Sequence, residues 1–446
     1  MGCTVGLTRM FHKIESVAFK DLTQFLIPSQ MGVGQKGGVE LVSRAVTAAF
    51  EENEGNCIAT SDKKNAYLSV NRPFILGALK YWAPKLVLPF LRAYSQNPRM
   101  IYFLCPDGIN AKGLSKVSYE CFRVMFGVVM GDPLAPYFYA IAQHHMEYVA
   151  KGLWMDEEQF EKLAKPTEYT DEKDTFNPAR YGEEELKEAK DTVGVIEEGE
   201  VVTASILDDT YMVATAKKLI QIQKIHEIIG HKAGFEEARE KTFILTNDSE
   251  VGPKDSVWAN YEGQVIHTNH KDEERDKAKQ GITIVGKPYG TPEYIKDSYE
   301  KLHAKHQAIA TDLKKMENIQ DAYLLTLGSL SKKAQFFFRI SDAEDTKGLA
   351  EAHDKMILEN LKEYMEIYTE ENEEGHQEGL EDRMIQPFKQ GGLGTVRMEH
   401  LKHVATLASW IDSARNTDIG EWFPTIAHLW ETNLAGQLEE LPRQLQ

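Results

Sequence analysis

The chain has 446 residues, which is enough for two or three domains that each bury their own core. Hydrophobic residues make up 42% of the sequence, and no run approaches the roughly 18 consecutive apolar residues of a membrane span. Because the N-terminus also lacks an apolar core followed by a small-residue cleavage site, we expect an intracellular protein of the nucleus or cytoplasm with no membrane partner.

The formal net charge of −18 is unusual for a protein that binds a phosphate backbone, since such proteins normally carry a basic surface. Residues 156–200 hold sixteen Asp and Glu against six Lys and Arg, and a second acidic run covers residues 363–382. Acidic stretches with few aromatic residues are usually solvated loops. We therefore interpret 156–200 as an acidic insert that need not line a nucleic-acid cleft.

Two helical stretches are predicted within residues 5–50, separated by a loop rich in glycine. Residues 57–60 form a short apolar strand that ends next to Asp62. A helix follows Pro73, and residues 127–150 have the pattern of a loop that runs into a helix.

A β-hairpin is predicted after the acidic insert, at residues 201–215. Strand-like runs at 201–206 and 211–215 are joined through the tight turn at 207–210. A helix is predicted at 217–230 and a strand at 242–246. The remaining elements are a short strand at 281–286 and helices from Pro292 almost to the end of the chain.

The order strand, helix, hairpin, helix, strand is that of a ferredoxin-like sheet with helices on one face. Such a sheet would place Asp62 beside Asp208 and Asp209. Clustered carboxylates repel one another unless a cation lies among them, and two Mg²⁺ ions bridged by carboxylates are the usual apparatus of phosphoryl transfer. An Asp-Asp pair is also common in ordinary turns, so the pair alone does not define a metal site.

Several ordered segments resemble the reverse transcriptases of non-LTR retrotransposons. The likeness covers about residues 5–410, and its segments follow one another in the family's order. They are residues 28–40 before the palm, 61–72 (SDKKNAYLSVNR) for the first palm motif, 127–136 (GVVMGDPLAP) for the second, 206–209 (ILDD) for the third, Gly234 with Lys241-Thr242 for the fourth, and 286–290 (GKPYG) for the primer-grip turn.

This resemblance implies an α+β fold of right-hand polymerase architecture, with a ferredoxin-like palm sheet, partial fingers and a helical thumb. The corresponding segments are 1–55 (fingers), 56–290 (palm) and 291–446 (thumb and C-terminal region). It also implies template-directed DNA synthesis from a primer 3′-end by two-metal nucleotidyl transfer, that is, an RNA-directed DNA polymerase. The implied partners are an RNA template, a DNA primer and deoxynucleoside triphosphates, and the cofactor is two Mg²⁺ ions, with Mn²⁺ as the alternative.

Site residues are carried over position by position. Asp62 and Asp208 would be metal ligands and Asp209 the weaker third carboxylate, while Lys241 would donate a proton to pyrophosphate or neutralise it. Tyr67 stands at the steric-gate position, where an aromatic ring leaves no room for a 2′-hydroxyl. The other nucleotide- or template-binding positions are Arg72, Met130, Gly131, Asp132 and Pro133, and those of the primer grip are Gly286, Pro288 and Gly290.

Two departures from the family pattern bear on activity. Met130 stands where the family usually has Gln, and a thioether cannot donate the hydrogen bonds of an amide. The family's Arg-Pro-Ile strand, whose Arg helps hold the triphosphate, does not precede Val5, so we expect an N-terminally truncated chain with Arg9 and Lys13 as the nearby cations. The alternative function is therefore a catalytically silent, reverse-transcriptase-derived relic that acts as a binding or scaffold protein.

Other patterns are less specific. Residues 32–37 match G-x-G-x-x-G but lack the preceding apolar strand and the following acid of a dinucleotide-binding fold. A nucleotide cyclase on a similar palm would account for the carboxylates but not for residues 131–134. The four cysteines form no C-x-x-C pair, which argues against a zinc knuckle. The aromatic run 336–338 fits either base stacking or packing within the thumb.

Overall fold

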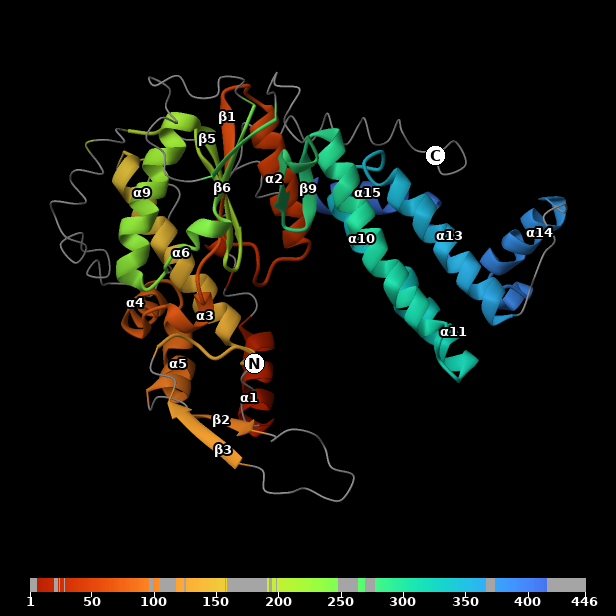
Figure 1. Cartoon of the computed structure of the whole chain (residues 1–446). Helices are drawn as coiled ribbons and strands as arrows, with labels where there is room; N and C mark the ends of the chain where they lie inside the picture. Colours follow the sequence, from red (N-terminus) through yellow and green to blue (C-terminus); the bar gives the residue numbers. More distant parts are fainter. Residues whose placement is uncertain are drawn as a thin grey trace. The chain divides into compact units, whose positions relative to one another are not determined.

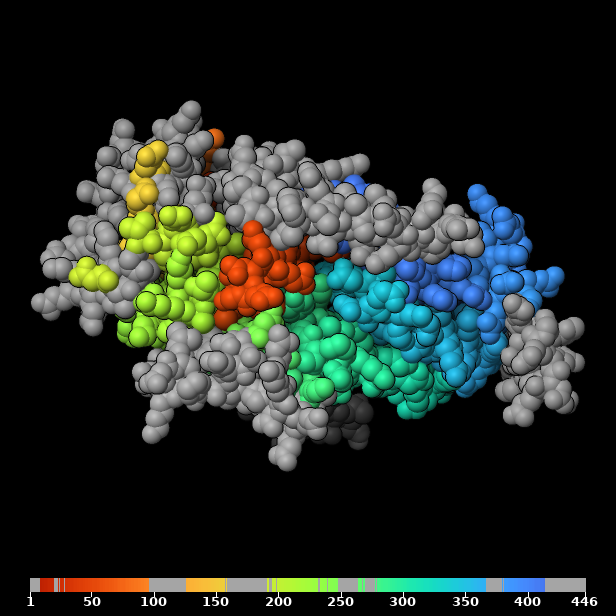
Figure 2. All heavy atoms as spheres, turned by 90° about the horizontal axis from the view of Figure 1, so that it is seen from above, coloured from red at the N-terminus to blue at the C-terminus, as the bar shows by residue number. Residues whose placement is uncertain are grey.

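The computed structural model describes residues 6–19, 29–95, 99–104, 118–123, 126–156, 199–247, 264–268, 277–365 and 374–414, with a few residues between these ranges. These are the coloured parts of Figure 1, and most of them are also coloured in the space-filling view of Figure 2. Most of the acidic insert at 156–200 and the C-terminal residues 415–446 lie outside the described residues. The fold is mixed α+β, as the sequence predicts, and the chain forms two compact units: 1–38, 55–244 and 254–264 in unit 1, and 39–54, 245–253 and 265–446 in unit 2.

The largest sheet has the strand order β4-β5-β1-β6-β7, and its strands β4, β5 and β1 belong to unit 1. Its strands are β1 (Asn56–Ser61), β4 (Val202–Ile206), β5 (Asp209–Thr215), β6 (Phe243–Thr246) and β7 (Gln264–His267). β7 was not expected from the sequence. The other four strands confirm the predicted order of strand, helix, hairpin, helix and strand.

Helices cover one face of this sheet. α9 (Ala216–Ala233) packs against β1 and β5, and it lies side by side with α6 (Ala135–Trp154), as Figure 1 shows. α6 is apolar around most of its circumference and most of its side chains are buried, which explains its place in the middle of the unit. β1 and β5 therefore rest on this helical layer, which holds the ends of both strands.

The remaining elements of unit 1 lie before α6 in the chain. α1 confirms the predicted first helix, and α4 confirms the helix after Pro73, whereas the hairpin β2–β3 and helix α5 were not expected. The elements are α1 (Gly6–Ala18), α3 (Ala66–Ser69), α4 (Arg72–Trp82), α5 (Val87–Tyr94), β2 (Arg99–Leu104) and β3 (Ser118–Arg123).

Unit 2 is largely helical, in agreement with the helices predicted from Pro292 onward. A two-stranded hairpin precedes the long helix α10, which begins with Thr291 Oγ1 accepting a hydrogen bond from the Tyr294 backbone N–H. The elements are α2 (Gly38–Glu51), β8 (Gly281–Ile284), β9 (Lys287–Gly290), α10 (Pro292–Leu313), α11 (Ile319–Gly328), α12 (Gln335–Ile340), α13 (Lys347–Tyr364), α14 (Glu374–Ile385) and α15 (Met398–Ala414).

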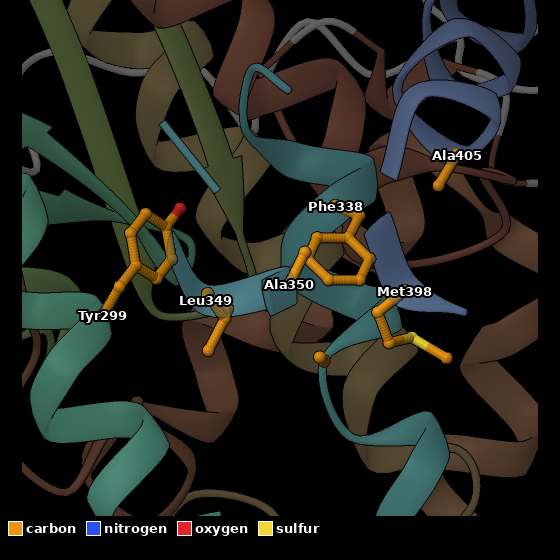
Figure 3. Packing of buried hydrophobic residues seen from close by; sticks show 7 residues of the cluster. Tyr299, Phe338, Leu349, Ala350, Met398 and Ala405 are labelled. Carbon is orange, nitrogen blue, oxygen red and sulfur yellow. The ribbon is translucent and has the colours of Figure 1, made fainter. Parts of the chain in front are cut away.

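A hydrophobic cluster joins four of these helices around Phe338 of α12, which is fully buried (Figure 3). Tyr299 of α10 packs into the same cluster, and its hydroxyl donates a hydrogen bond to Ser341 Oγ at 2.6 Å. Within the aromatic run, Phe338 therefore packs in the core, whereas Phe336 is 43% exposed. The other members of the cluster are Ala334, Leu349, Ala350, Met398 and Ala405.

In the part of the chain that the structure describes, none of the helices combines the length and the apolar character needed to span a bilayer.

Candidate functional site

The ends of two neighbouring strands bring three acidic residues together. β1 and β5 are antiparallel, and their ladder ends with Ser61 opposite Thr210, so the next facing positions are Asp62 and Asp209. Asp208 directly precedes Asp209 in the tight turn between β4 and β5. The structure thus places the three predicted carboxylates at one edge of the sheet, although nearly 150 positions separate them in the sequence.

The turn that carries Asp208 is held by Gln30, whose side chain is buried. Gln30 Oε1 accepts hydrogen bonds from the backbone N–H groups of Leu207 (2.8 Å) and Gly32 (2.9 Å), and its Nε2 donates to the Leu207 carbonyl oxygen at 3.0 Å. Leu207 has a φ of 55°, in the left-handed region that costs a residue with a side chain about 1 kcal/mol or more. The two bonds between Gln30 and Leu207 offset this strain and fix the turn, and the bond from Gly32 orients the Gln30 side chain.

Electrostatic repulsion acts among the three carboxylates. Desolvation raises the pKa of Asp208, and the charge of Asp62 raises it further. The surrounding protein also desolvates the carboxyl of Asp209, and together with Asp208 and Asp62 it raises the pKa of Asp209 to about 6. Lys241 Nζ donates a hydrogen bond to Asp62 Oδ2 at 2.7 Å, and this bond raises the pKa of the lysine. A single cation therefore offsets part of the charge of three acids.

The chemistry of this cluster suits a hard divalent cation, because Mg²⁺ prefers carboxylate oxygens and would relieve the repulsion that raises the pKa values. Among the described residues, no three His, Cys, Asp or Glu side chains already stand at metal-ligand spacing. Instead, Lys241 occupies one oxygen of Asp62. A cation bound here would have to compete with that lysine.

The segment that carries Lys241 is attached to the end of β1. The Ala238 N–H donates to the Asp62 carbonyl oxygen at 2.9 Å, and an isolated antiparallel bridge pairs Lys63 with Glu237. The side chains of that pair are buried, with Lys63 Nζ 2.7 Å from Glu237 Oε1. Asp62 and Lys241 are thus connected through the backbone as well as through their side chains.

An aromatic pair lies close to the acidic edge. Tyr67 of α3 stacks on Tyr139 of α6, with ring centroids 4.8 Å apart and an interplanar angle of 13°. Desolvation and then the charge of Asp208 raise the pKa of Tyr67, which keeps its hydroxyl protonated. The loop beneath Tyr67 requires glycine at position 127, because φ there is 61° and a Cβ would lie 2.2 Å from the Tyr67 carbonyl oxygen.

A pocket of about 730 Å³ opens beside Tyr67 within unit 1. One wall is α1, which contributes Arg9 and Lys13, and the other is the loop that leads into α6. Five of the predicted nucleotide- and template-binding residues line it together. The complete lining is Arg9, Met10, Lys13, Tyr67, Met130, Gly131, Asp132, Pro133 and Pro136.

Arg72, predicted as a sixth such residue, is not part of this lining and contacts the loop that supports it. Its Nε donates to the Gly127 carbonyl oxygen at 2.9 Å, and its guanidinium lies over the Tyr94 ring at 5.2 Å. The contact with the pocket is therefore indirect, through the backbone beneath Tyr67.

The carboxylate of Asp132 is buried and accepts three hydrogen bonds. His12 Nδ1 lies 2.6 Å from Oδ1, the Leu134 N–H donates to the same oxygen at 3.0 Å, and the Tyr94 hydroxyl donates to Oδ2 at 3.0 Å. Since an ionised carboxylate only accepts, the His12 Nδ1 must carry the proton in this contact. The side chain of Asp132 thus organises the pocket wall.

The predicted primer-grip residues belong to unit 2. Gly286 forms the β8–β9 turn together with Val285, and both have positive φ, 98° and 43°. Pro288 and Gly290 lie in β9, where Gly290 pairs with Gly281 of β8. The structure therefore places all three on one hairpin, and the exposed Phe336 ring lies beside its turn, 3.0 Å from the position of a Cβ on Gly286.

Sequence reasoning did not assign a role to Gln30, His12 or Glu237. Each acts through a partner more than 100 positions away, so no local spacing reveals it. For Gln30, the only sequence signal is its place in the segment 28–40 that resembles the family. Arg9 and Lys13 were noted as cations, and their spacing of four residues puts them on the same face of a helix.

No protein-family model matches the chain, and no curated protein gives a significant match. Among solved structures, it is similar to telomerase from Candida albicans in complex with a fragment of telomeric RNA, at a TM-score of 0.27 and 11% identity over 94% of this chain. It is also similar to telomerase from Candida tropicalis with such an RNA fragment, at a TM-score of 0.30 and 10% identity over 97% of this chain. Apo telomerase from Candida tropicalis gives a TM-score of 0.32 and 10% identity over 95% of this chain. The chain spans 56, 57 and 60% of the length of these three chains.

Proposed function

We propose that this chain is a DNA polymerase of the reverse-transcriptase type, which extends a primer 3′-end on an RNA template. The observation that carries the proposal is the β1–β5 register, which sets Asp62 opposite Asp209 and next to Asp208. A second observation supports it: the pocket beside Tyr67, a residue whose pKa the charge of Asp208 helps to raise, combines that aromatic ring with two cations. A deoxynucleoside triphosphate has the matching chemistry, with an apolar sugar face and a chain of phosphates.

Each wall of the pocket would recognise a different part of the nucleotide. Arg9 and Lys13 would bind the phosphates, since charge-assisted hydrogen bonds to phosphate are strong and arginine can make them in pairs. Tyr67, stacked on Tyr139, would lie under the sugar and exclude a 2′-hydroxyl. Met130 would contribute an apolar contact in place of the amide that the family usually has there.

Asp62, Asp208 and Asp209 would hold the metal ions. Bound Mg²⁺ would lower the pKa of the primer 3′-hydroxyl and neutralise charge on the leaving pyrophosphate. Lys241 would lose its pairing with Asp62 when a cation binds, and its ammonium group would then be available to the pyrophosphate. Gln30 would hold the Asp208 turn in place during this exchange.

In this proposal the chain is the polymerase of a retrotransposon, and Gly286, Pro288 and Gly290 contact the primer. Because the acidic runs at 156–200 and 363–382 carry much of the net charge of −18, the rest of the chain can still contact the phosphate backbone of the nucleic acid, and binding should weaken as salt is raised.

Primer extension on an RNA template in Mg²⁺ tests the proposal. Asp208→Asn keeps the shape of the side chain and removes its charge, so extension should fall to background. Asp312→Asn removes an exposed carboxylate of unit 2 and serves as the matched control. Extension that survives Asp208→Asn would show that Asp208 is not a metal ligand.

A chain that extends no primer, with either Mg²⁺ or Mn²⁺ and on either RNA or DNA template, would favour the silent binding or scaffold protein. A separate test addresses the aromatic gate. Tyr67→Val should allow incorporation of ribonucleoside triphosphates, whereas the wild type should reject them. Equal discrimination by the two proteins would remove Tyr67 from the sugar site.

A further inference from the structure

Helix α1 carries the two cations of the pocket, yet the large apolar side chains described between its residues 10 and 17 do not pack into a core. Phe11 and Ile14 are each 59% exposed and Val17 is 70% exposed. Burial of these side chains therefore contributes little to holding this part of the helix in place. Among residues 9–14 of the helix, His12 is buried while its neighbours are exposed.

Among the described residues, two polar contacts attach α1 to the loop before α6 and to the first turn of α6. At the first, His12 meets the carboxylate of Asp132 at 2.6 Å, and the side chains on both sides are almost fully buried. At the second, one turn further along, the Tyr137 hydroxyl donates to the Ser16 carbonyl oxygen at 3.0 Å. A hydrogen bond between a ring N–H and a charged carboxylate is stronger than one between neutral groups, so the first contact is the stronger attachment.

Asp132 is itself rigidly held, which makes it a suitable anchor. Its two oxygens accept from the Leu134 N–H and from the Tyr94 hydroxyl. The Tyr94 oxygen in turn accepts from the Val129 N–H at 3.1 Å, so the anchor is connected to the backbone on both sides of the pocket loop.

We propose that His12 and Asp132 form a positioning pair, which fixes Arg9 and Lys13 over the pocket so that they meet the phosphates of a bound nucleotide. His12 is three residues after Arg9 and adjacent to Lys13, so fixing it sets both the rotation and the height of the helix face that bears the cations. This inference rests on the proposed function and deepens it, because it names the part of the protein that prepares phosphate recognition. Neither residue touches the phosphates itself.

The pair can be tested by the affinity for dTTP and for inorganic tripolyphosphate, which carries only phosphates. His12→Ala should weaken both by about tenfold, and it should raise the KM for dTTP by a similar factor while kcat changes less than threefold. His12→Asn should retain most of the affinity, because its amide nitrogen branches from the same carbon as Nδ1 and can still donate to Asp132. Circular dichroism and thermal midpoints show whether each variant is folded.

A double-mutant cycle separates positioning from a general loss of structure. In a chain that already carries Arg9→Ala and Lys13→Ala, His12→Ala should have no further effect on tripolyphosphate affinity. Tyr137→Phe removes the second attachment of α1 and is the matched control, expected to change the affinity less than twofold. An equal effect of His12→Ala with and without the two cations would overturn the proposal, as would equal losses in His12→Asn and His12→Ala.

The result also distinguishes this inference from the proposed function. Titration of dTTP requires no chemistry. A wild type that binds dTTP as tightly as His12→Ala does would overturn the positioning pair alone. A wild type that binds neither dTTP nor tripolyphosphate and extends no primer would overturn both.

Discussion

Replacing Glu147 by Gln should stabilise the protein at alkaline pH, although the substitution removes a charge that lies beside a histidine. Glu147 of α6 and His226 of α9 are buried, with Oε2 3.3 Å from Nε2. No described residue gives either carboxylate oxygen or either ring nitrogen a hydrogen bond. Burial raises the pKa of Glu147 to about 7 and lowers that of His226 to about 3, so the two groups do not form an ion pair at neutral pH.

The size of the effect follows from proton binding in the folded and unfolded chains. Glu147 ionises near pH 4.5 when unfolded and near pH 7 when folded, so the folded chain binds the proton more tightly. The stability gained in this way is fully present below pH 4.5 and is lost as the pH rises through 7. At 1.36 kcal/mol per pKa unit, the contribution of Glu147 to the stability of the wild type falls by about 2.5 kcal/mol between pH 5 and pH 8. Gln has the shape of the protonated acid and does not titrate, so the variant keeps this stability.

Urea unfolding at pH 5 and pH 8 measures the difference. Glu237→Gln is the matched control, because Glu237 is also buried but accepts hydrogen bonds from Lys63 Nζ at 2.7 Å and Ser61 Oγ at 2.9 Å. That substitution leaves a buried cation without its partner and should destabilise the protein by about 3 kcal/mol. The reasoning would be refuted if wild type and Glu147→Gln showed the same pH dependence, or if both substitutions changed stability in the same direction at pH 8.

Three further substitutions test other parts of the structure. Gly32→Ala would bring a Cβ to 2.8 Å from the Leu207 backbone nitrogen and displace the acidic turn, so primer extension should fall by about tenfold to a hundredfold; unchanged extension would contradict this. Gly77→Ala, inside α4 with no atom within 4 Å of the new Cβ, should raise the free energy of unfolding by about 0.5–1 kcal/mol, and a decrease would show a hidden clash. Phe338→Ala should lower it by about 3–5 kcal/mol and weaken hydrogen-exchange protection in α10 and α13, because the ring is fully buried in their shared core. Protection that stays at the wild-type level would mean that the cluster does not hold these helices together.

Much of the acidic edge could be predicted from the sequence because it depends on short-range patterns. Residues 57–60 are apolar and stop at Asp62, and two strand-like runs flank Asp208 and Asp209, so the ends of the strands are marked by the chain itself. The antiparallel pairing then follows from the order of the elements. The side chains that support this edge could not be predicted. Lysine is usually a surface residue, and the charge of the buried Lys63 is paired with a glutamate that lies 174 positions away in the sequence.

The unexpected strands show the same limit in the fold. β9 contains a proline and a glycine, residues with low β propensity, and its pairing is imposed by the β8–β9 turn. β2 and β3 pair across a connection of 13 residues, far longer than a two-residue hairpin loop, so the turn signal Asp107-Gly108 within it does not mark the two strands as partners. In these cases the strands form because of their pairing partners, and the β propensity of their own residues does not predict them.

Because side chains alternate between the two faces of a strand, the candidate site depends on the number of residues in β1 as well as on the identity of its acids. Successive residues of a strand point to opposite faces, and here Asp62 is partly exposed while Lys63 beside it is buried. The deletion of one residue anywhere between Asn56 and Ser61 would exchange these faces, sending the carboxylate inward and the ammonium outward. A deletion of this kind would therefore remove the site without changing any of its three acids.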